Sequence, residues 1–465
     1  MTRSRRYRPY PPWPARADQY AGRVTSLQED QPEATPATDR PRRRLLVDLT
    51  PLRVSKPYRR MWYGVALSGI GTQLTTVTVG LQVYELTGST FSVGMVGLFA
   101  VVPLITLGLY GGSIVDAHNR RTVVLVTGSG LLVIAVGFAA QAWLAVGSVW
   151  LLYGLVAVQS GFFAVNTPAR TAIVPRLLPG RLLPAANALF GLTSGAAFTL
   201  GPLSAGLLVG WWGYGPAYSA QVACLLVALL TLLSLPSLPP TGEVRRAGVK
   251  SVLEGLRFLS TRPNVRMTFF VDLAAMILAM PRVLFPAIGA AVIGGDATTV
   301  GILVAGIAVG SGLAGLLSGP LGHVRRQGLA VLIAVICWGV AIAGFGVVVA
   351  LAPGASPGEG AHWILWPAVA CLVVAGAADA VSAVFRTTIL QSATPDHLRG
   401  RLQGVFTVVV AGGPYAGDLV LGTGAEFASE AVAAIVGGLA CVAVVLALAA
   451  RQTRFARYDA WHPTP

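Results

Sequence analysis

The chain has 465 residues, of which 54% are hydrophobic and 11% charged, and its formal net charge is +15. This composition excludes an ordinary soluble globular domain and indicates a polytopic membrane protein. Fourteen of the 34 Lys and Arg residues precede Met61 and most others fall in short loops, so the expected partner of these charges is the lipid bilayer, not nucleic acid.

The first 57 residues are rich in Arg, Pro, Asp and Thr and are predicted to form a disordered basic tail. Twelve apolar segments follow, each close to the ~20 residues that cross a hydrocarbon core of about 30 Å. Since lipid offers no hydrogen bonds to a backbone, each is predicted to be a helix. The predicted spans are 61–84, 91–113, 122–143, 149–169, 183–210, 215–236, 266–291, 299–321, 328–351, 363–388, 402–424 and 428–450.

These segments predict an all-α polytopic membrane protein with an N-terminal six-helix bundle over 58–236 and a C-terminal one over 266–450. The linker over 237–265 has apolar residues at helical spacing from Val249 to Leu259 and is predicted to carry an amphipathic surface helix. Residues 451–465 are predicted to form a second tail. Pro281 and Pro286 are expected to end or kink helices because proline lacks a backbone donor.

The distribution of basic residues predicts the orientation. If the amino terminus is cytoplasmic, 33 of the 34 Lys and Arg residues fall on the cytoplasmic side, with Arg170 in an inner loop, and only Arg282 lies inside a span. By the positive-inside rule, both termini are predicted to be cytoplasmic.

Three motifs occur twice and predict an internal duplication. The loop from Gly111 to Arg121 contains Gly112, Asp116, Arg120 and Arg121, and a weaker copy in the second half ends at Arg325 and Arg326. Arg170 and Arg386, each followed by a proline at the same spacing, form the second pair. The third pair comprises Gly201, Pro202 and Gly206 in the fifth span and Gly413 and Pro414 in the eleventh.

The first loop resembles the signature loop of the major facilitator superfamily. Tyr84–Ser89, Pro168-x-Arg170 and the Arg399-Gly400-Arg401 segment are similar to the exporter branch that includes the enterobactin exporter and multidrug efflux proteins. The fifth-span Gly-Pro motif resembles an antiporter motif, although Ala197 replaces its upstream glycine and the fourth span lacks the arginine of many drug/proton antiporters.

This resemblance implies two bundles that alternate access to a midplane site. It implies that Asp116 faces the start of the eleventh helix near Gly400 when the cytoplasmic side is closed. A carboxylate at a helix amino terminus contributes roughly 0.3–1 kcal/mol when exposed, so it can bias a two-state gate. The alternative is a simple turn acid paired with Arg120 or Arg121.

Five charged residues lie within the predicted second-half spans: Asp272, Arg282, Asp379, Arg386 and Asp418. Intramembrane charges normally face a cavity or a partner. Depth along the helices predicts the pairs Asp272–Arg386 and Arg282–Asp418 and leaves Asp379 without a full partner. Such a carboxylate can carry a proton, with Asp379 the first candidate and Asp418 the second. The alternative is that all five are structural pairs.

The predicted function is therefore secondary active transport in a bacterial plasma membrane, by a monomer that exports a small lipophilic or amphipathic drug, siderophore or metabolite, coupled to protons or another ion. No cofactor, metal site or enzymatic activity is expected, because cysteines and histidines show no such spacing. An importer or facilitator is the alternative, followed by a non-transporting sensor. The residues expected to line the cavity in spans one, four and seven are Gln73, Thr76, Gln159, Asn166, Met276 and Met280.

Overall fold

The computed structural model describes residues 48–179, 182–236, 257, 259–318, 321, 324–352, 362–392 and 396–459. The side chains of residues 109, 111–113, 116, 184, 391–392 and 396–411 are not part of the description. The tail before Asp48 and the predicted amphipathic helix of the linker, apart from isolated positions near its end, lie outside the described residues.

The described chain is helical almost throughout. The first half contains α2 (Thr50–Val54), α3 (Lys56–Thr87), α4 (Thr90–Ala117), α5 (Arg120–Trp143), α6 (Val149–Leu177), α7 (Leu183–Trp212) and α8 (Tyr214–Leu233). The second half contains α10 (Pro263–Leu278), η3 (Pro281–Leu284), α11 (Phe285–Ala287), η4 (Ile288–Val292), α12 (Ala297–Leu316), α13 (Gln327–Ala350), η6 (His362–Ile364), α14 (Leu365–Ser392), α15 (Asp396–Phe427), α16 (Glu430–Arg451) and α17 (Thr453–Ala456).

Among the described residues, eleven helical segments are long and apolar enough to cross a membrane. The 32-residue α15 occupies the place of the predicted eleventh span. The all-α membrane class is confirmed.

Short polar turns separate the helices. Gly88 ends α3 with a φ of 63°, in the left-handed region that glycine adopts without strain. Ser89 then caps α4, because its hydroxyl accepts a hydrogen bond from the Ser92 amide. Ser148 and Ser429 cap α6 and α16 in the same way. These caps explain why the chain reverses direction within a few residues at one end of the bundles.

Span seven covers Pro263–Val292 and is interrupted where Pro281 was expected to end or kink it: α10 ends at Leu278 and η3 begins at Pro281, which has no amide hydrogen to continue the ladder. Two sequence-based boundaries were wrong. Arg170 lies inside α6, not in a loop, because this helix continues through Pro168 and Pro175 to Leu177.

The second wrong boundary concerns both predicted tails. The helices α2 and α3 begin within the stretch assigned to the first tail, and Pro51 of α2 is buried. At the other end, Phe455 and Tyr458 are buried at 0% and 2% exposure, and α17 packs against α13 and α10. Residues 453–458 therefore belong to the second bundle.

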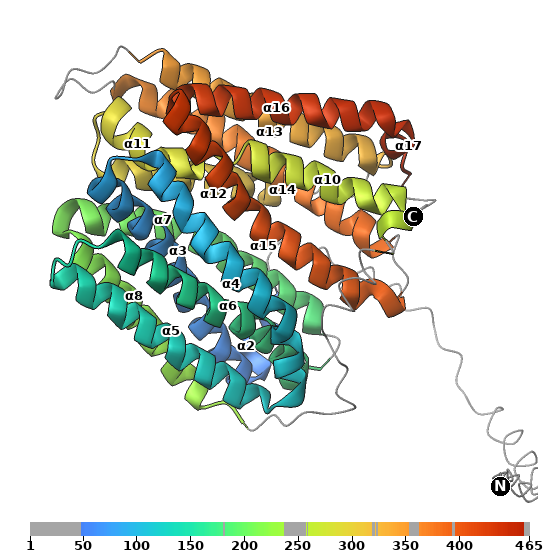
Figure 1. Cartoon of the computed structure of the whole chain (residues 1–465). Coiled ribbons are helices and arrows are strands. Elements are labelled where there is room, and N and C mark those ends of the chain that lie inside the picture. Colours follow the sequence, from blue (N-terminus) through green and yellow to red (C-terminus); the bar gives the residue numbers. More distant parts are fainter. Residues whose placement is uncertain are drawn as a thin grey trace, which may run out of the picture. The chain divides into compact units, whose positions relative to one another are not determined.

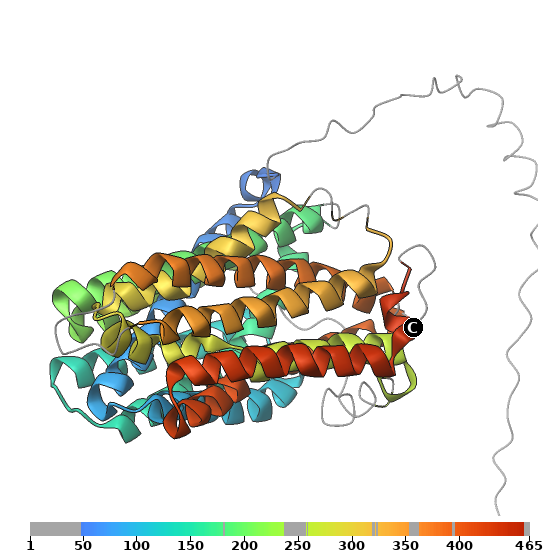
Figure 2. The same cartoon turned by 90° about the horizontal axis from the view of Figure 1, so that it is seen from above.

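Each half forms a bundle of its own, drawn from blue to green and from yellow to red (Figure 1). In the second half, α13 packs between α14 and α16, and Figure 2 shows these three helices side by side. The halves meet through two helix pairs, α4 with α15 and α7 with α12. The helices α3, α6, α10 and α14 lie next to these interface helices: α3 packs on α7, α6 on α4, α10 on α15 and α14 on α12.

Glycines permit the helices of the two halves to approach closely at the end opposite to Asp48 and Asp459. A Cβ on Gly97 of α4 would lie 2.7 Å from the Tyr415 carbonyl oxygen of α15. A Cβ on Gly206 of α7 would lie 2.6 Å from the Ala297 carbonyl oxygen of α12. Real side chains do not tolerate such distances, so the two halves are closed against each other at this end.

A buried amide pair joins three helices of the first half. Gln82 of α3 and Gln141 of α5 exchange two side-chain hydrogen bonds of 3.1 and 3.0 Å. The hydroxyl of Tyr218 in α8 donates a third, 2.8 Å long, to the Gln82 carbonyl oxygen. Because lipid cannot replace these partners, the network holds the three helices in one register.

Candidate transport site and gates

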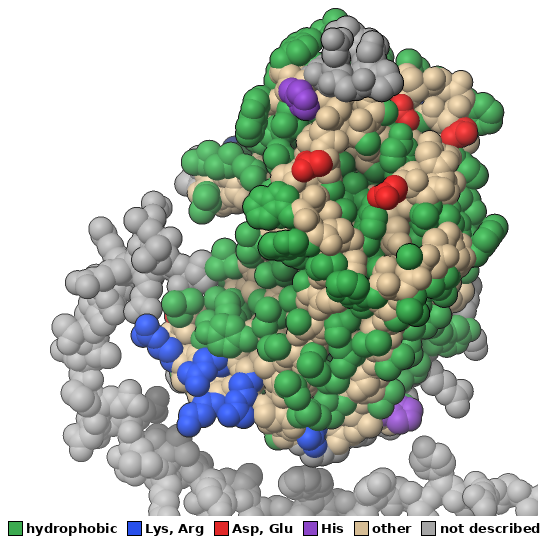
Figure 3. Space-filling view, turned by 90° about the vertical axis from the view of Figure 1, so that its left-hand side faces the viewer, with side chains coloured by type: hydrophobic (Ala, Val, Ile, Leu, Met, Phe, Trp, Pro, Cys, Tyr) green, Lys and Arg blue, Asp and Glu red, His purple; other side chains and the backbone are tan. Residues whose placement is uncertain are grey.

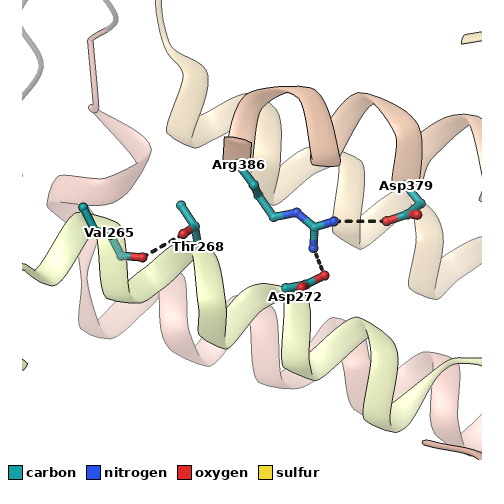
Figure 4. A network of polar contacts seen from close by, with 5 residues as sticks. All are labelled: Val265, Thr268, Asp272, Asp379 and Arg386. Atoms are coloured by element: carbon teal, nitrogen blue, oxygen red, sulfur yellow. Dashed lines mark hydrogen bonds and ion pairs between the residues drawn. The ribbon is translucent and has the colours of Figure 1, made fainter. Parts of the chain in front are cut away.

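The central polar feature of the second half is Arg386 with two aspartates (Figure 4). Arg386 of α14 donates through Nη1 to Asp272 of α10 and through Nη2 to Asp379, 3.3 Å away and two turns earlier on α14. The side chains of Arg386 and Asp272 are 5% and 3% exposed, whereas that of Asp379 is 32% exposed. The group carries a net charge of −1 when both carboxylates are ionised, and Asp379 is its accessible member.

The predicted Asp272–Arg386 pair is thus present, but Asp379 differs from the expectation. It shares Arg386 with Asp272, since a seven-residue spacing returns to the same helix face. Oδ2 of Asp272 and Nε of Arg386 are buried and have no hydrogen-bond partner within the described residues. The triad is therefore not fully satisfied.

The second predicted pair, Arg282 with Asp418, is also present. Arg282 of η3 donates from Nε to Oδ1 of Asp418 in α15 at 2.9 Å and from Nη2 to Oδ2 at 2.6 Å. Its guanidinium carbon lies 5.0 Å from the centre of the Tyr415 ring, within the range of a cation–π contact. A Cβ on Gly97 would lie 3.4 Å from Asp418 Oδ2, so this pair lies where the first half packs against the second.

A third intramembrane cation, Arg170, was missed because span four was predicted to end at residue 169, whereas α6 continues to Leu177. Its Nη1 donates to the Ser68 hydroxyl of α3 at 2.7 Å. Ser68 in turn donates to the Val65 carbonyl oxygen. No carboxylate pairs with Arg170 in the described part of the chain. The repeat match with Arg386 was the signal that could have placed it inside a helix.

The predicted gate residues are only partly described. Gly112 and Asp116 lie in the last turns of α4 and Gly400 lies in α15, but their surroundings are outside the description. Arg120 donates to the Ala172 carbonyl oxygen of α6 and Arg121 to that of Leu233 at the end of α8, both at 2.9 Å. These two arginines therefore join α5 to its neighbours.

The second copy of the loop contacts the carboxyl-terminal segment. Arg325 forms a 2.8 Å ion pair with Asp459, and the backbone of Arg326 pairs with that of Asp459 in an isolated bridge. The duplicated motif thus has different partners in the two halves.

The fifth-span and eleventh-span motifs pack helices together. A Cβ on Gly201 would lie 2.5 Å from Gln73 Cβ of α3, and one on Gly413 would lie 3.1 Å from Met276 Cβ of α10. A Cβ on Gly301 of α12 would lie 2.7 Å from the Pro202 carbonyl oxygen, next to Gly206. Pro414 lies inside α15. The motif therefore sets helix contacts within each half and, at Pro202 and Gly206, between the halves.

The predicted cavity residues have different surroundings. Asn166 is buried and donates to the Thr127 hydroxyl at 2.7 Å, and Met276 is buried against α15. Thr76 is exposed, with its hydroxyl bonded to the Thr72 carbonyl oxygen of its own helix. Gln159 and Met280 are partly exposed. Asn166 and Met276 thus pack helices together. The described residues contain no cluster of His, Cys, Asp and Glu that could hold a metal ion.

Comparison with known proteins identifies the family. A family model described as a transmembrane secretion effector matches residues 47–462. The chain belongs to this family. The enterobactin exporter EntS of Shigella boydii serotype 18 is 31% identical over 88% of this chain and 95% of its own length. EntS of Escherichia coli strain K12 is 30% identical over 89% of this chain and 96% of its own length.

Solved structures agree with the fold. A point mutant of the nucleoside transporter NupG has a TM-score of 0.67 at 13% identity and covers 85% of this chain and 99% of its own. A POT family transporter in complex with a thioalcohol-conjugated peptide has a TM-score of 0.68 at 10% identity, and the match covers 86% of this chain and 96% of that transporter. The family member described here is thus a major facilitator superfamily exporter, a multi-span membrane protein that acts on small molecules.

Proposed function

We propose that this exporter moves small amphipathic molecules, siderophores among them, out of the cytoplasm in exchange for protons. The observation that carries the coupling is the Arg386 triad. Asp379 is the accessible carboxylate of two that share one guanidinium, and it lies on α14, next to the interface helix α12. When it takes up a proton, Asp272 keeps Arg386 neutralised, so protonation leaves no unpaired cation.

The charge distribution supports an orientation with both termini in the cytoplasm. Lys and Arg side chains gather at one end of the face in Figure 3, and Asp and Glu side chains at the other. Glu85, Asp296, Glu426 and Glu430 lie next to helix connections at the end opposite to Asp48. The positive-inside rule places the basic end in the cytoplasm. In this orientation, the contacts at Gly97 and Gly206 close the outer side.

Asp116 is proposed to close the cytoplasmic side when the bundles rock, by approaching the amino-terminal turn of α15. The support is its position at the end of α4, the helix that packs along α15. Asp116→Asn is expected to reduce export without reducing the amount of inserted protein. Export at the wild-type rate would contradict the gate.

The coupling is tested in proteoliposomes that contain the purified exporter as a monomer, with enterobactin and a lipophilic dye as cargo. Export by the wild-type protein is expected to stop when the proton gradient is dissipated. Asp379→Asn is expected to remove the dependence of export on that gradient, whereas Asp459→Asn, in the surface pair with Arg325, is expected to keep it. Gradient-dependent export by Asp379→Asn would exclude Asp379 as the carrier, and gradient-independent export by the wild type would exclude proton coupling.

A further inference from the structure

Arg170 and Arg386 occupy equivalent places in the two halves. They lie in matching motifs, each close to two turns before the end of its helix, α6 or α14. At about 1.5 Å per residue, both lie about 10 Å from those ends. Each reaches the first long helix of its half: Arg170 contacts Ser68 of α3, and Arg386 contacts Asp272 of α10. Ser68 therefore takes the place that Asp272 takes in the second half.

The two arginines differ in how their charge is neutralised. Both arms of Arg386 are bound to carboxylates. Arg170 has only the Ser68 hydroxyl on Nη1, its Nε is buried without a partner, and its Nη2 makes no hydrogen bond and is not buried, within the described part of the chain. A cation held inside a helix of a membrane protein without an anion is costly unless a ligand supplies one.

The residue two turns before each arginine also differs between the halves. In α14 it is Asp379, which binds Arg386. In α6 the equivalent position is Phe163, which is 42% exposed. The same two-turn spacing keeps Phe163 on the face of Arg170. The first half therefore presents one cation and one aromatic ring where the second half presents a group with net charge −1.

We propose that Arg170 and Ser68 bind the anionic oxygen group of the exported molecule, with its aromatic body toward Phe163. This assignment rests on the proposed function. It makes the cargo an amphipathic aromatic anion, and it orients the anionic group of the cargo toward the first half. Nη2 of the guanidinium is the accessible donor without a partner among the described residues, and Asp379 repels the same group from the second half. The two N–H groups of Nη2 suit an oxyanion such as a carboxylate, a catecholate or a sulfonate.

The substitution Ser68→Asp distinguishes an anion site at Arg170 from a purely structural role for this arginine. Ser68→Asp places a carboxylate where the second half has Asp272, so it would strengthen a clamp between α3 and α6. It would also neutralise Arg170 internally and so remove the anion site. Ser68→Asn is the matched control, because it keeps a polar partner and adds no charge. Arg170→Gln removes the cation, and Arg170→Lys keeps it.

The test uses two fluorescent probes with the same kind of aromatic body, anilinonaphthalene sulfonate as the anion and phenylnaphthylamine as the neutral analogue. Binding is measured with the full chain in lipid nanodiscs, and the signal of empty nanodiscs is subtracted. Size-exclusion profiles establish that each variant is folded. For Ser68→Asp and Arg170→Gln we expect affinity for the anion to fall by about tenfold or more with affinity for the neutral probe unchanged, since an interaction with a poorly solvated charge is lost.

Ser68→Asn is expected to keep most of the preference for the anion, and Arg170→Lys to keep part of it, because the charge remains but the paired N–H groups are lost. Unchanged anion affinity in Ser68→Asp and Arg170→Gln, or an equal loss for both probes in folded protein, would overturn the assignment. A parallel efflux assay in proteoliposomes separates this from the proposed function. If the wild type binds the anion through Arg170 and exports neither probe nor enterobactin, the proposed function fails while the binding site stands.

Discussion

Arg386 of α14 binds Asp272 of α10 across 114 residues of sequence, with both side chains almost completely excluded from solvent. Removing the cation leaves two carboxylates, Asp272 and Asp379, without a positively charged partner. Breaking a buried ion pair typically costs about 3–5 kcal/mol. Arg386→Gln is therefore expected to lower the free energy of unfolding in detergent by that amount, as measured by denaturant titration.

Two variants calibrate this result. Asp272→Asn should cost less than Arg386→Gln, because Asp379 still neutralises the guanidinium. Arg325→Gln breaks an ion pair whose arginine is 58% exposed, and exposed pairs contribute about 0–1 kcal/mol. Equal stability losses in Arg386→Gln and Arg325→Gln would contradict the importance of the buried triad.

Gly206 sets the distance between the halves on the side opposite to Asp48 and Asp459. Gly206→Leu is expected to disfavour this closed state, because overpacking costs about 1–3 kcal/mol and the Ala297 carbonyl lies in the way. The measurement is thiol labelling of Ala297→Cys in a chain whose four native cysteines are replaced. Labelling should accelerate about fivefold or more, which is the population change that corresponds to about 1 kcal/mol or above.

Gly195→Leu is the control for this experiment, since Gly195 lies on the same helix and a Cβ there would meet nothing within 4 Å. Its labelling rate is expected to match that of the wild type. If Gly206→Leu also labels at the wild-type rate, the contact between α7 and α12 is not a gate.

The Gln82–Gln141–Tyr218 network should contribute to the stability of the first half. Gln141→Leu removes both hydrogen bonds between Gln82 and α5 and leaves the Gln82 amide nitrogen without an acceptor, while its carbonyl oxygen keeps Tyr218. Leaving a buried donor unsatisfied costs about 1–3 kcal/mol, so the unfolding midpoint of this variant is expected to fall. Thr76→Val removes an exposed hydroxyl bonded to its own helix and should leave the midpoint unchanged. A similar fall of the unfolding midpoint in both variants would indicate that removing any polar group from a helix has this effect.

Phe455 belongs to the core of the second half although it lies beyond the last span. It is fully buried, whereas Phe427 at the end of α15 is 87% exposed. Replacing a buried Phe by Ala typically costs about 3–5 kcal/mol. Phe455→Ala is therefore expected to be markedly less stable than Phe427→Ala in a thermal melt of the detergent-solubilised protein. Equal melting temperatures would show that the carboxyl-terminal segment is only loosely attached.

The sequence predicted the helices well because apolar length and loop charge are local properties. Depth along those helices was enough to pair Asp272 with Arg386 and Arg282 with Asp418. Pro281 was expected to end or kink a helix, but the sequence did not decide between the two, because a proline in an apolar run fits both a kinked helix and an interrupted one. Arg170 was assigned to a loop because hydropathy alone cannot distinguish a charge near a helix end from one just outside it.

The partners within the bundles were harder to predict. Nothing in the order of residues indicates that Asn166 bonds Thr127 or that Met276 packs on Gly413, since both depend on which faces of two helices meet. The attachment of residues 453–458 was missed for a related reason. A single Phe and Tyr among basic residues resemble a solvated tail unless the groove that receives them is known.

The position of Phe455 and Tyr458 has a consequence for biosynthesis. Domains tend to fold in the order in which they leave the ribosome. The first bundle has all of its described helices once Leu233 has emerged, whereas the second lacks two buried aromatic rings until Tyr458 has emerged. The two bundles, similar in architecture, therefore reach completion at different stages of translation: the first can mature while the second is still being synthesised.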